Sequence, residues 1–335
     1  MTHSLRPTGD QLSALVLAVL TRHNRVPDEP GWHVQVAPGG SADRTFSVRD
    51  PTGVPRLTAR LARLGMADRL SHEERILQEL AREGASALID VADRGGTSSR
   101  PSPRDVALIE DNALTGRWLL VHEHMPGQPA PLAKVSTAAR ERLGECLAWI
   151  HGHSRAGCTI WPLLETEHGT RVDLYQARLA TLRRYRSAQG LLPEVADLID
   201  LLAGVNLSLN AGWHERDFAL CHGDLSIGNI LWNGDAVALI DWEFARDGDP
   251  AEDIAYLVAE QAVSPDLMAD IAEAYVAAAG DPWAFARLPV WLPLVALDAA
   301  LWWADYHLAQ GVGPDGQPDV ALRLSRAQGY LRHGA

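Results

Sequence analysis

Two periodicities divide the chain. Hydrophobic and polar residues alternate over residues 33–36 and 45–48, which is the pattern of β-strands with one buried face. Farther along, Leu143, Leu147 and Ile150 recur at helical spacing, which indicates an amphipathic helix. The pattern therefore predicts a sheet-rich first part and a mostly helical second part.

Turn residues and apolar runs extend this prediction. Further strands are expected near 56–63, at 87–91, and as a hairpin of 106–109 with 118–121. Early helices are expected over 11–20, with Thr8 as cap, and from Ser71 through Leu80, with Ser71 and Glu74 as a capping box. Later helices are expected at 138–151, 172–185, 195–202, 250–279, 284–309 and 320–331.

The composition is that of a folded, globular protein. With 335 residues, 47% of them hydrophobic, the chain is long enough for two lobes. No apolar run approaches the roughly 18 to 20 residues of a membrane span. The apolar stretch 12–20 is short and lacks a following cleavage site, so a secretory signal is not expected. We expect a cytoplasmic location and no membrane partner.

The net charge of −13 narrows the range of partners. An acidic surface is a poor match for nucleic acid, whereas it would attract a cationic small molecule. Six acids and one arginine, Arg246, lie between Asp241 and Asp253. Acidity can also serve solubility alone, so the charge by itself leaves the substrate open.

Cysteine and histidine spacing predicts no zinc site. Cys146, Cys158 and Cys221 are few and odd in number, which argues against a disulfide framework and favours buried thiols. The pairs His122 with His124 and His151 with His153 lack a third ligand. His222 is expected to be a structural hydrogen-bonding residue.

Three polar clusters lie within 220–256. They are His222-Gly223-Asp224 with Asn229, then Asp241 after the apolar run 236–240, then Gly248-Asp249-Pro250 with Asp253. Residues 237–240 suit a buried strand, and 230–232 are its expected hairpin partner across the turn 233–235. Asn229 and Asp241 would then lie on one side, near Asp224.

One amide and two carboxylates in this arrangement suit phosphoryl transfer. A carboxylate must orient the attacking hydroxyl and accept its proton, and oxygen ligands must hold Mg²⁺ against the phosphates. Asp224 fits the first role, and Asn229 and Asp241 fit the second.

The pattern HGD-x4-N, followed by Ile-Asp-Trp-Glu and GDP-x2-D, resembles the aminoglycoside phosphotransferase and choline kinase-like enzymes, which are small-molecule relatives of the protein kinases. By this resemblance Asp224 is the catalytic base, Asn229 and Asp241 are metal ligands, and Asp253 is a structural acid. It also implies ATP or GTP and Mg²⁺ as cofactors. The implied fold is α/β (α+β) and two-lobed, with an antiparallel sheet and one helix in the N-terminal lobe and a mostly helical C-terminal lobe.

The segment 123–127 resembles the family's hinge, whose backbone meets the adenine edge of the nucleotide. Glu123 and Met125 are therefore candidate nucleotide contacts. We expect an N-terminal helical extension at 1–30, a nucleotide-binding lobe at 31–126, and a catalytic and substrate-binding lobe at 127–335.

Contacts to the nucleotide phosphates follow from the same resemblance. Gly39, Gly40 and Ser41 lie in a turn between two expected strands. The turn resembles the nucleotide-covering loop of the family, although without the later motifs it would be a plain hairpin.

Kinases place a lysine on the third strand, but the only lysine here, Lys134, lies far downstream. We expect Arg60 to replace it, with Arg56 and Arg63 as alternatives, because arginine keeps the charge and can bind phosphate through several donors. Glu73 is the expected partner of Arg60, and Glu74 is the alternative.

A late helix carries candidate substrate contacts. Asp298, Trp302 and Asp305 recur at i, i+4 and i+7 and so share one face. A flat ring flanked by acids could receive a sugar or an amine, but burial of the tryptophan in the core is an equally good interpretation. Glu243 and Asp247 are further candidates to line the substrate cleft.

The sequence therefore favours transfer of the γ-phosphate of ATP or GTP to a hydroxyl of a small molecule. One lysine among many arginines and alanines is typical of a GC-rich genome, which makes an antibiotic-like natural product, and hence resistance or self-protection, the first hypothesis. A metabolic kinase for choline, homoserine or a sugar is the alternative. A nucleotide-binding pseudo-enzyme is a third, and only the missing lysine supports it.

Overall fold

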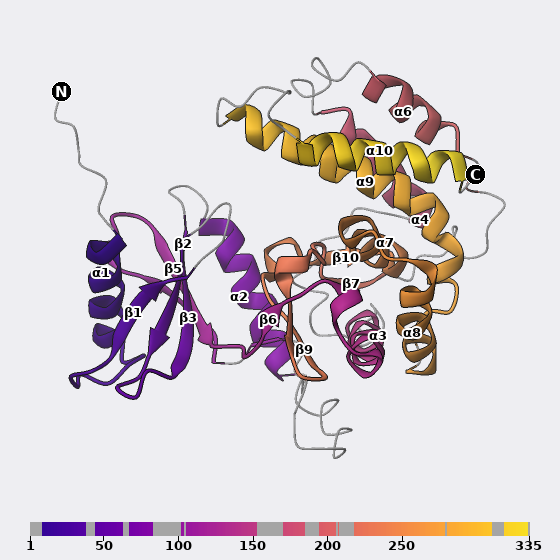
Figure 1. Ribbon diagram of the computed structural model, residues 1–335. Helices are drawn as coiled ribbons and strands as arrows, with labels where there is room; N and C mark the ends of the chain where they lie inside the picture. Colours follow the sequence, from indigo (N-terminus) through magenta and orange to yellow (C-terminus); the bar gives the residue numbers. More distant parts are fainter. Residues whose placement is uncertain are drawn as a thin grey trace, which may run out of the picture. The chain divides into compact units, whose positions relative to one another are not determined.

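The chain forms two units in the computed structural model (Figure 1). The first comprises Met1–Gly127 and Ala238–Phe244, and the second comprises Gln128–Val237 and Ala245–Ala335. The segment Ala238–Phe244 thus joins the first unit, although it lies within the expected second lobe by sequence. The structure describes residues 9–37, 44–62, 67–82, 102–103, 105–152, 170–184, 194–205, 207, 218–278, 280–309 and 318–333.

An antiparallel five-stranded sheet frames the first unit, in the order β1-β2-β3-β5-β4. Its strands are β1 (His33–Val36), β2 (Arg44–Arg49), β3 (Pro55–Leu61), β4 (Ala107–Glu110) and β5 (Trp118–Glu123). The alternating segments of the sequence therefore form strands as expected. The expected strand at 87–91 lies outside the described residues. In the central strand β3, Arg60 pairs with Thr45 on one side and Leu120 on the other.

Helix α1 (Gly9–Arg22) packs on β1 and belongs to the core of this unit. Its buried residues Val16 and Val19 form one apolar cluster with Phe46 and Val121 of the sheet. The amphipathic pattern of the helix explains this burial, because apolar residues recur on one helical face.

Helix α2 (Ala67–Arg82) packs against β4 and β5 and buries Leu70 in a separate small cluster with Leu120. The expected capping box was wrong, because the helix begins at Ala67 and Ser71 lies inside it. The Glu74 carboxylate instead accepts a hydrogen bond from the Leu108 backbone N–H at 3.1 Å. Glu74 therefore links the helix to the sheet.

Helices make up most of the second unit. They are α3 (Thr137–His151), α4 (Arg171–Leu182), α6 (Glu194–Ala203), α7 (Pro250–Gln261), α8 (Pro265–Ala277), α9 (Ala284–Ala309) and α10 (Pro318–His333). The expected helical run 250–279 divides in two, since Ala262 adopts a left-handed φ of 50° and the Ser264 side chain caps α8.

Two small sheets complete the second unit. Strand β7 (Ala219–Cys221) pairs with β10 (Arg246–Gly248), and β6 (Gln128–Pro129), β8 (Ile230–Asn233) and β9 (Ala236–Leu239) form a sheet in the order β6-β8-β9. The expected hairpin of β8 and β9 is thus confirmed. The chain passes from the second unit to the first within β9.

Helices α3 and α8 approach closely at one glycine. A Cβ atom at Gly144 would lie 2.3 Å from the carbonyl oxygen of Ile271 and 2.9 Å from the backbone nitrogen of Tyr275. Only glycine allows this approach, and the packing fixes Tyr275 relative to α3. The Tyr275 side chain is fully buried.

Among the described residues, α9 is long and apolar enough to cross a membrane by length and composition alone. In the fold, however, 67% of its apolar window is buried. It packs on α7 and α10 and lies beside α10 in Figure 1. These are the properties of a core helix.

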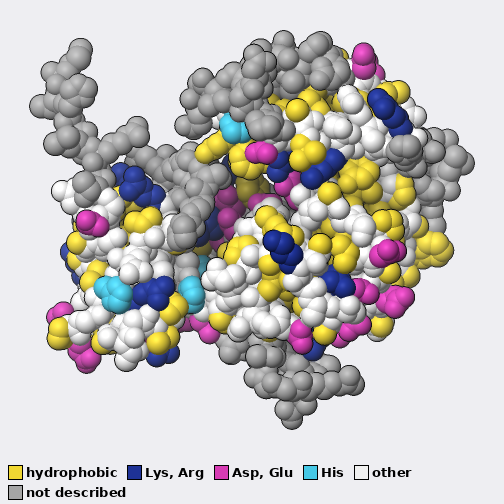
Figure 2. Space-filling view, in the orientation of Figure 1, with side chains coloured by type: hydrophobic (Ala, Val, Ile, Leu, Met, Phe, Trp, Pro, Cys, Tyr) yellow, Lys and Arg dark blue, Asp and Glu magenta, His cyan; other side chains and the backbone are white. Residues whose placement is uncertain are grey.

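The elements confirm the expected fold class. The protein has a protein-kinase-like fold, with an N-terminal antiparallel sheet carrying a helix and a mostly helical C-terminal part. On the face drawn in Figure 2, basic side chains lie in small separate groups among acidic and hydrophobic ones. The absence of a nucleic-acid partner stays a prediction.

Candidate functional site

The segment 222–229 follows strand β7 and is fixed by a buried carboxylate. Asp253, in the first turn of α7, accepts hydrogen bonds from the backbone N–H groups of His222 (2.7 Å) and Gly223 (2.8 Å). Burial opposes ionisation of Asp253, but the hydrogen bonds it accepts hold its pKa below the usual range. Two fixed amides set the backbone from which Asp224 projects.

Asp224 and Asn229 contact each other within this loop. The Asn229 amide nitrogen donates to the Asp224 carboxylate at 2.9 Å and to the Asp224 backbone carbonyl at 3.1 Å. These bonds use the two amide protons, so the Asn229 carbonyl oxygen remains available to a cation. Asn229 is buried, whereas Asp224 is only half-buried. The pair thus presents a carboxylate held in place by an amide.

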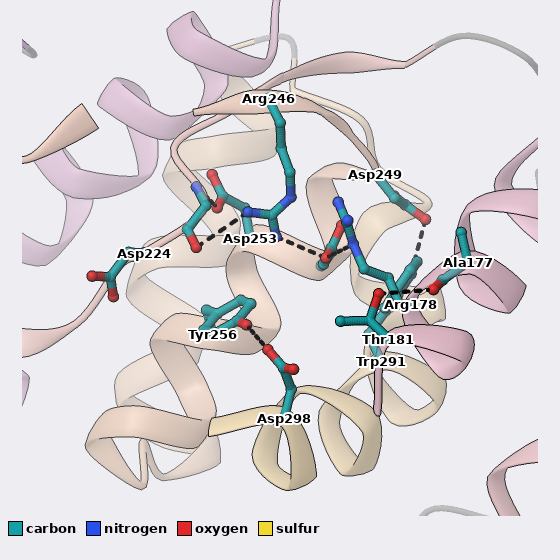
Figure 3. Close-up of polar contacts among 12 residues, drawn as sticks. Ala177, Arg178, Thr181, Asp224, Arg246, Asp249, Asp253, Tyr256, Trp291 and Asp298 are labelled. Carbon is teal, nitrogen blue, oxygen red and sulfur yellow. Dashed lines mark hydrogen bonds and ion pairs between the residues drawn. The ribbon is translucent and has the colours of Figure 1, made fainter. Parts of the chain in front are cut away.

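A partly buried ion-pair network supports the same loop (Figure 3). Arg246 donates to the Gly223 carbonyl (3.4 Å) and to the Glu252 carboxylate (2.8 Å), and Arg178 of α4 donates to the same carboxylate (2.7 Å). The Asp224 carboxylate points away from this network in Figure 3. The network therefore holds the backbone of the loop that carries Asp224.

Asp241 lies in the first unit, in a strained backbone conformation. Its φ of 67° falls in the left-handed region, which costs a non-glycine residue about 1–3 kcal/mol. Its carboxylate accepts a hydrogen bond from Arg60 at 2.8 Å, and its side chain is 35% exposed. Strain of this kind persists only where the surrounding contacts hold it.

Arg60 contacts three carboxylates. Its guanidinium donates to Glu73 (2.7 Å), Asp241 (2.8 Å) and Glu243 (3.3 Å). Among the alternatives, Arg56 pairs with Asp50 at 2.7 Å. The other alternative, at position 63, lies outside the described residues. The structure therefore brings Arg60 and Glu73 together, as expected.

Glu73 also holds the backbone that follows Asp241. Its carboxylate accepts a hydrogen bond from the Trp242 backbone N–H at 3.1 Å. Burial raises the pKa of Glu73 to about 7, although Arg60 favours the ionised form. Asp241 and Glu243 act in the same direction as burial, because their negative charges repel the ionised form of Glu73.

A family model described as the phosphotransferase enzyme family matches residues 33–291. The chain belongs to this family. The match covers both units, including the Asp224 loop and the segment of Asp241. By its family the chain is thus a phosphotransferase.

Solved structures share the fold of this phosphotransferase. A macrolide 2′-phosphotransferase from Brachybacterium faecium is 20% identical, with a TM-score of 0.62 over 92% of this chain and 97% of that one. A choline/ethanolamine kinase family protein from Mesorhizobium loti is 19% identical, with a TM-score of 0.60 over 95% of each chain. At such identity the likeness establishes the fold alone.

A curated relative matches in sequence. Acyl-CoA dehydrogenase family member 11 of Rattus norvegicus is 27% identical over 169 residues, which is 47% of the phosphotransferase and 20% of that relative. The chain therefore matches only a fifth of the length of this relative.

The expected nucleotide contacts of the phosphotransferase are only partly described. Gly39, Gly40 and Ser41 lie outside the described residues. Met125 is buried, and the Glu123 backbone carbonyl accepts a hydrogen bond from the His122 ring at 2.8 Å. Their roles in nucleotide binding stay predictions.

The three late-helix candidates lie on α9, and their side chains are half-buried. The Tyr256 hydroxyl donates to Asp298 at 2.6 Å (Figure 3), and burial raises the pKa of Asp298. Trp302 stacks on Tyr306, with ring centroids 5.5 Å apart and planes 7° apart. Trp302 is thus not enclosed in the core, and with Asp298 and Asp305 it stays a candidate substrate contact.

The other two substrate candidates, Glu243 and Asp247, lie among protein contacts. Glu243 pairs with Arg60 and lies 3.8 Å from Arg69, and its side chain is 9% exposed. Asp247 is buried in β10. Their roles toward a substrate also stay predictions.

Sequence reasoning missed the support of the Asp224 loop by Arg246 and Arg178. A signal was available for Arg246, because it is the only basic residue among six acids between Asp241 and Asp253. A lone arginine in an acidic run is expected to pair with one of its acids when the run is buried. No comparable signal marks Arg178.

Proposed function

We propose that this phosphotransferase moves the γ-phosphate of ATP or GTP to a hydroxyl group of a small molecule, with Asp224 as the catalytic base. The observation that carries the proposal is the contact of Asp224 with Asn229 on a loop whose amides bind Asp253. A base must be held in position and yet be accessible. Asp224 is half-buried in a fixed loop, so it meets both requirements.

The chemistry of Asn229 and Asp241 fits Mg²⁺. Both offer oxygen atoms, which is what this hard cation prefers. The Asn229 carbonyl oxygen is left over after its amide protons bind Asp224, and the Asp241 carboxylate is partly exposed. When bound, Mg²⁺ would neutralise charge on the phosphates. Asp224 would orient the acceptor hydroxyl and accept its proton.

Arg60 would supply the positive charge that the family's lysine usually provides. Its guanidinium stays charged at any relevant pH and can donate to phosphate oxygens from several N–H groups. Glu73 holds it at 2.7 Å. Arg60 would turn from Asp241 to a phosphate once Asp241 carries a cation.

An antibiotic-like natural product is the acceptor class that we propose first. The composition and the likeness in fold to a macrolide 2′-phosphotransferase support it. The second candidate is a metabolic acceptor, namely choline, homoserine or a sugar. The half-buried face of Asp298 and Trp302, which could receive a sugar or an amine, favours this alternative.

A phosphate-transfer screen tests the proposal. Purified protein with Mg²⁺ and labelled ATP or GTP is incubated with aminoglycosides, macrolides, peptide and nucleoside antibiotics, choline, homoserine and sugars. We expect transfer to one antibiotic, abolished in Asp224→Ala. Transfer to choline, homoserine or a sugar alone would favour the metabolic alternative. Nucleotide binding without transfer or Mg²⁺-dependent hydrolysis would contradict the proposal and favour a pseudo-enzyme.

A further inference from the structure

A continuous series of buried hydrogen bonds ends at the Asp224 loop. The Asp281 backbone N–H donates to the Tyr275 hydroxyl at 3.3 Å. The Tyr275 hydroxyl lies 3.1 Å from His151 Nδ1, and His151 Nε2 lies 3.2 Å from the Asp253 carboxylate. Asp253 in turn binds the two amides that precede Asp224. The series therefore links α8 and α3, through α7, to the base.

The donors and acceptors in this series have one consistent direction. The Tyr275 oxygen accepts from the Asp281 amide, so its single proton is free to point at His151 Nδ1. Nε2 must carry a proton, because the Asp253 carboxylate can only accept, and Nδ1 is then placed to accept the Tyr275 proton. Nε2 donates to Asp253. Tyr275 thereby selects the tautomer of His151 that can bind Asp253.

Close packing fixes the Tyr275 ring in this series. The approach of α3 at Gly144 sets the position of its backbone, and a Cβ atom at Gly280 would lie 2.3 Å from a ring carbon. The ring meets His151 edge to face at 5.7 Å and Phe285 at 5.5 Å. The hydroxyl consequently has little freedom to leave His151.

We propose that His151 and Tyr275 are positioning residues for phosphoryl transfer. They hold the Asp253 carboxylate in the orientation that binds the His222 and Gly223 amides, and so they set the place of Asp224. Asp253 accepts two backbone donors and one histidine donor in a buried setting. The loss of one such donor leaves a buried acceptor unpaired and lets the carboxylate turn.

A metal site is the competing explanation for the same cluster. Ligand atoms of His151, Cys221 and Asp253 lie within 4.8 Å of one another. The Nε2 proton, however, points at Asp253, and both Asp253 oxygens bind backbone amides. Burial raises the pKa of the Cys221 thiol well above its ordinary value, which keeps it protonated. The hydrogen bonds thus account for the cluster without a cation.

Tyr275→Phe is the first test, because it removes the hydroxyl and keeps the packed ring. We expect kcat for Mg²⁺-dependent ATP hydrolysis to fall roughly tenfold to a hundredfold, since a small misplacement of a catalytic group has effects of this size. The KM for ATP should stay within about twofold, because the nucleotide contacts are untouched. Phe285→Leu is the matched control: it perturbs the same ring packing and should leave kcat unchanged.

His151 provides the second test. His151→Gln keeps an N–H group near the place of Nε2 and should retain more turnover than His151→Leu, at a similar melting temperature. In the unmodified protein, ¹⁵N NMR should show the His151 ring protonated on Nε2 and not on Nδ1, and this signature should change in Tyr275→Phe. A ring protonated on Nδ1, or a Tyr275→Phe variant with normal kcat, would overturn the proposal.

The inference rests on the proposed role of Asp224 as base. An Asp224→Asn variant distinguishes a failure of that role from a failure of the positioning role of His151 and Tyr275. If Asp224→Asn retains turnover, the proposed function fails. If Asp224→Asn is inactive while Tyr275→Phe has normal kcat, only the positioning role fails. The NMR signature is independent of turnover, so it decides the tautomer in either case. Cobalt(II) absorption from a thiolate at Cys221 would instead favour the metal site.

Discussion

Two charge clusters, one in each unit, differ in their balance. In the second unit, Arg171 and Arg287 face two acids, Asp249 and Asp281. Arg287 is completely buried and donates to Asp249 at 2.6 Å and to Asp281 at 2.6 Å. Among the described residues of this cluster, positive and negative side chains match in number.

Among the residues that the structure describes, the cluster in the first unit has more acids than bases. Glu73, Asp241 and Glu243 all contact Arg60, and Arg69 adds one more positive charge 3.8 Å from Glu243. Excess negative charge in a partly buried setting is costly unless a cation balances it or an acid takes up a proton, which the raised pKa of Glu73 favours. The comparison indicates that a charge-balanced cluster serves the fold, whereas a cluster with excess negative charge is suited to bind a cation.

The largest expected effect is on turnover and comes from Asp224→Ala. Removal of the proposed base should lower kcat by about 10²–10⁴-fold and leave nucleotide binding nearly intact. Phosphate transfer from labelled ATP measures the first, and calorimetric titration with a non-hydrolysable ATP analogue measures the second. Asp200→Ala, an exposed acid of α6, is the control and should be normal. Near-normal turnover in Asp224→Ala would refute the assignment of the base.

The next largest effect is on the free energy of unfolding and comes from the cluster of Arg287 with Asp249 and Asp281. Arg287→Ala leaves Asp249 buried without its main partner and should lower the free energy of unfolding by about 3–5 kcal/mol. Urea denaturation measures the change. Arg142→Ala removes the partly exposed pair with Glu145 and should cost at most about 1 kcal/mol. Equal losses in the two variants would contradict the comparison.

The site could be predicted from the sequence where its residues are close along the chain. Asp224 and Asn229 are five positions apart, and their contact follows from the loop that joins β7 to β8. The strands also followed from alternation, because a half-buried sheet imposes a period of two.

Partners far apart in the chain were harder to predict. Arg60 was paired with Glu73 only through the resemblance to a family, since no local rule joins a strand to a later helix. The contact of Glu243 with Arg60 spans 183 positions and was not anticipated. The start of α2 was also missed, because Ser71 and Glu74 match a capping box by type while the helix already begins at Ala67.

The third prediction concerns Arg60, where the unbalanced cluster meets the nucleotide. Arg60→Ala should weaken binding of a non-hydrolysable ATP analogue with Mg²⁺ by about ten- to a hundredfold, since charge-assisted hydrogen bonds are worth about 1.5–3 kcal/mol. Arg63→Ala should have a smaller effect. Titration calorimetry measures both. The reverse ranking would move the phosphate contact to Arg63. Arg60→Lys restores the charge and should recover part of the affinity.

The smallest expected effect is a pH dependence of stability, which comes from His122 near Arg60. Burial lowers the pKa of His122 to about 4, and Arg60 acts in the same direction while Asp241 opposes it. In the unfolded chain a histidine titrates near 6.5. Between these values the unfolded state binds more protons, so stability contributed by neutral His122 is complete above about pH 6.5 and is lost as the pH falls towards 4.

His122→Asn tests this dependence, because asparagine keeps a donor for the Glu123 carbonyl and cannot titrate. From pH 7 to pH 5 the unmodified protein should lose about 1–2 kcal/mol more stability than the variant, measured by urea denaturation at each pH. Identical pH profiles would mean that the pKa of His122 in the folded protein is not lowered, because the acids around Arg60 stabilise its protonated form. A protonated His122 would then balance part of the negative charge of these acids. In that case the contrast with the Arg287 cluster would no longer identify a cation-binding site.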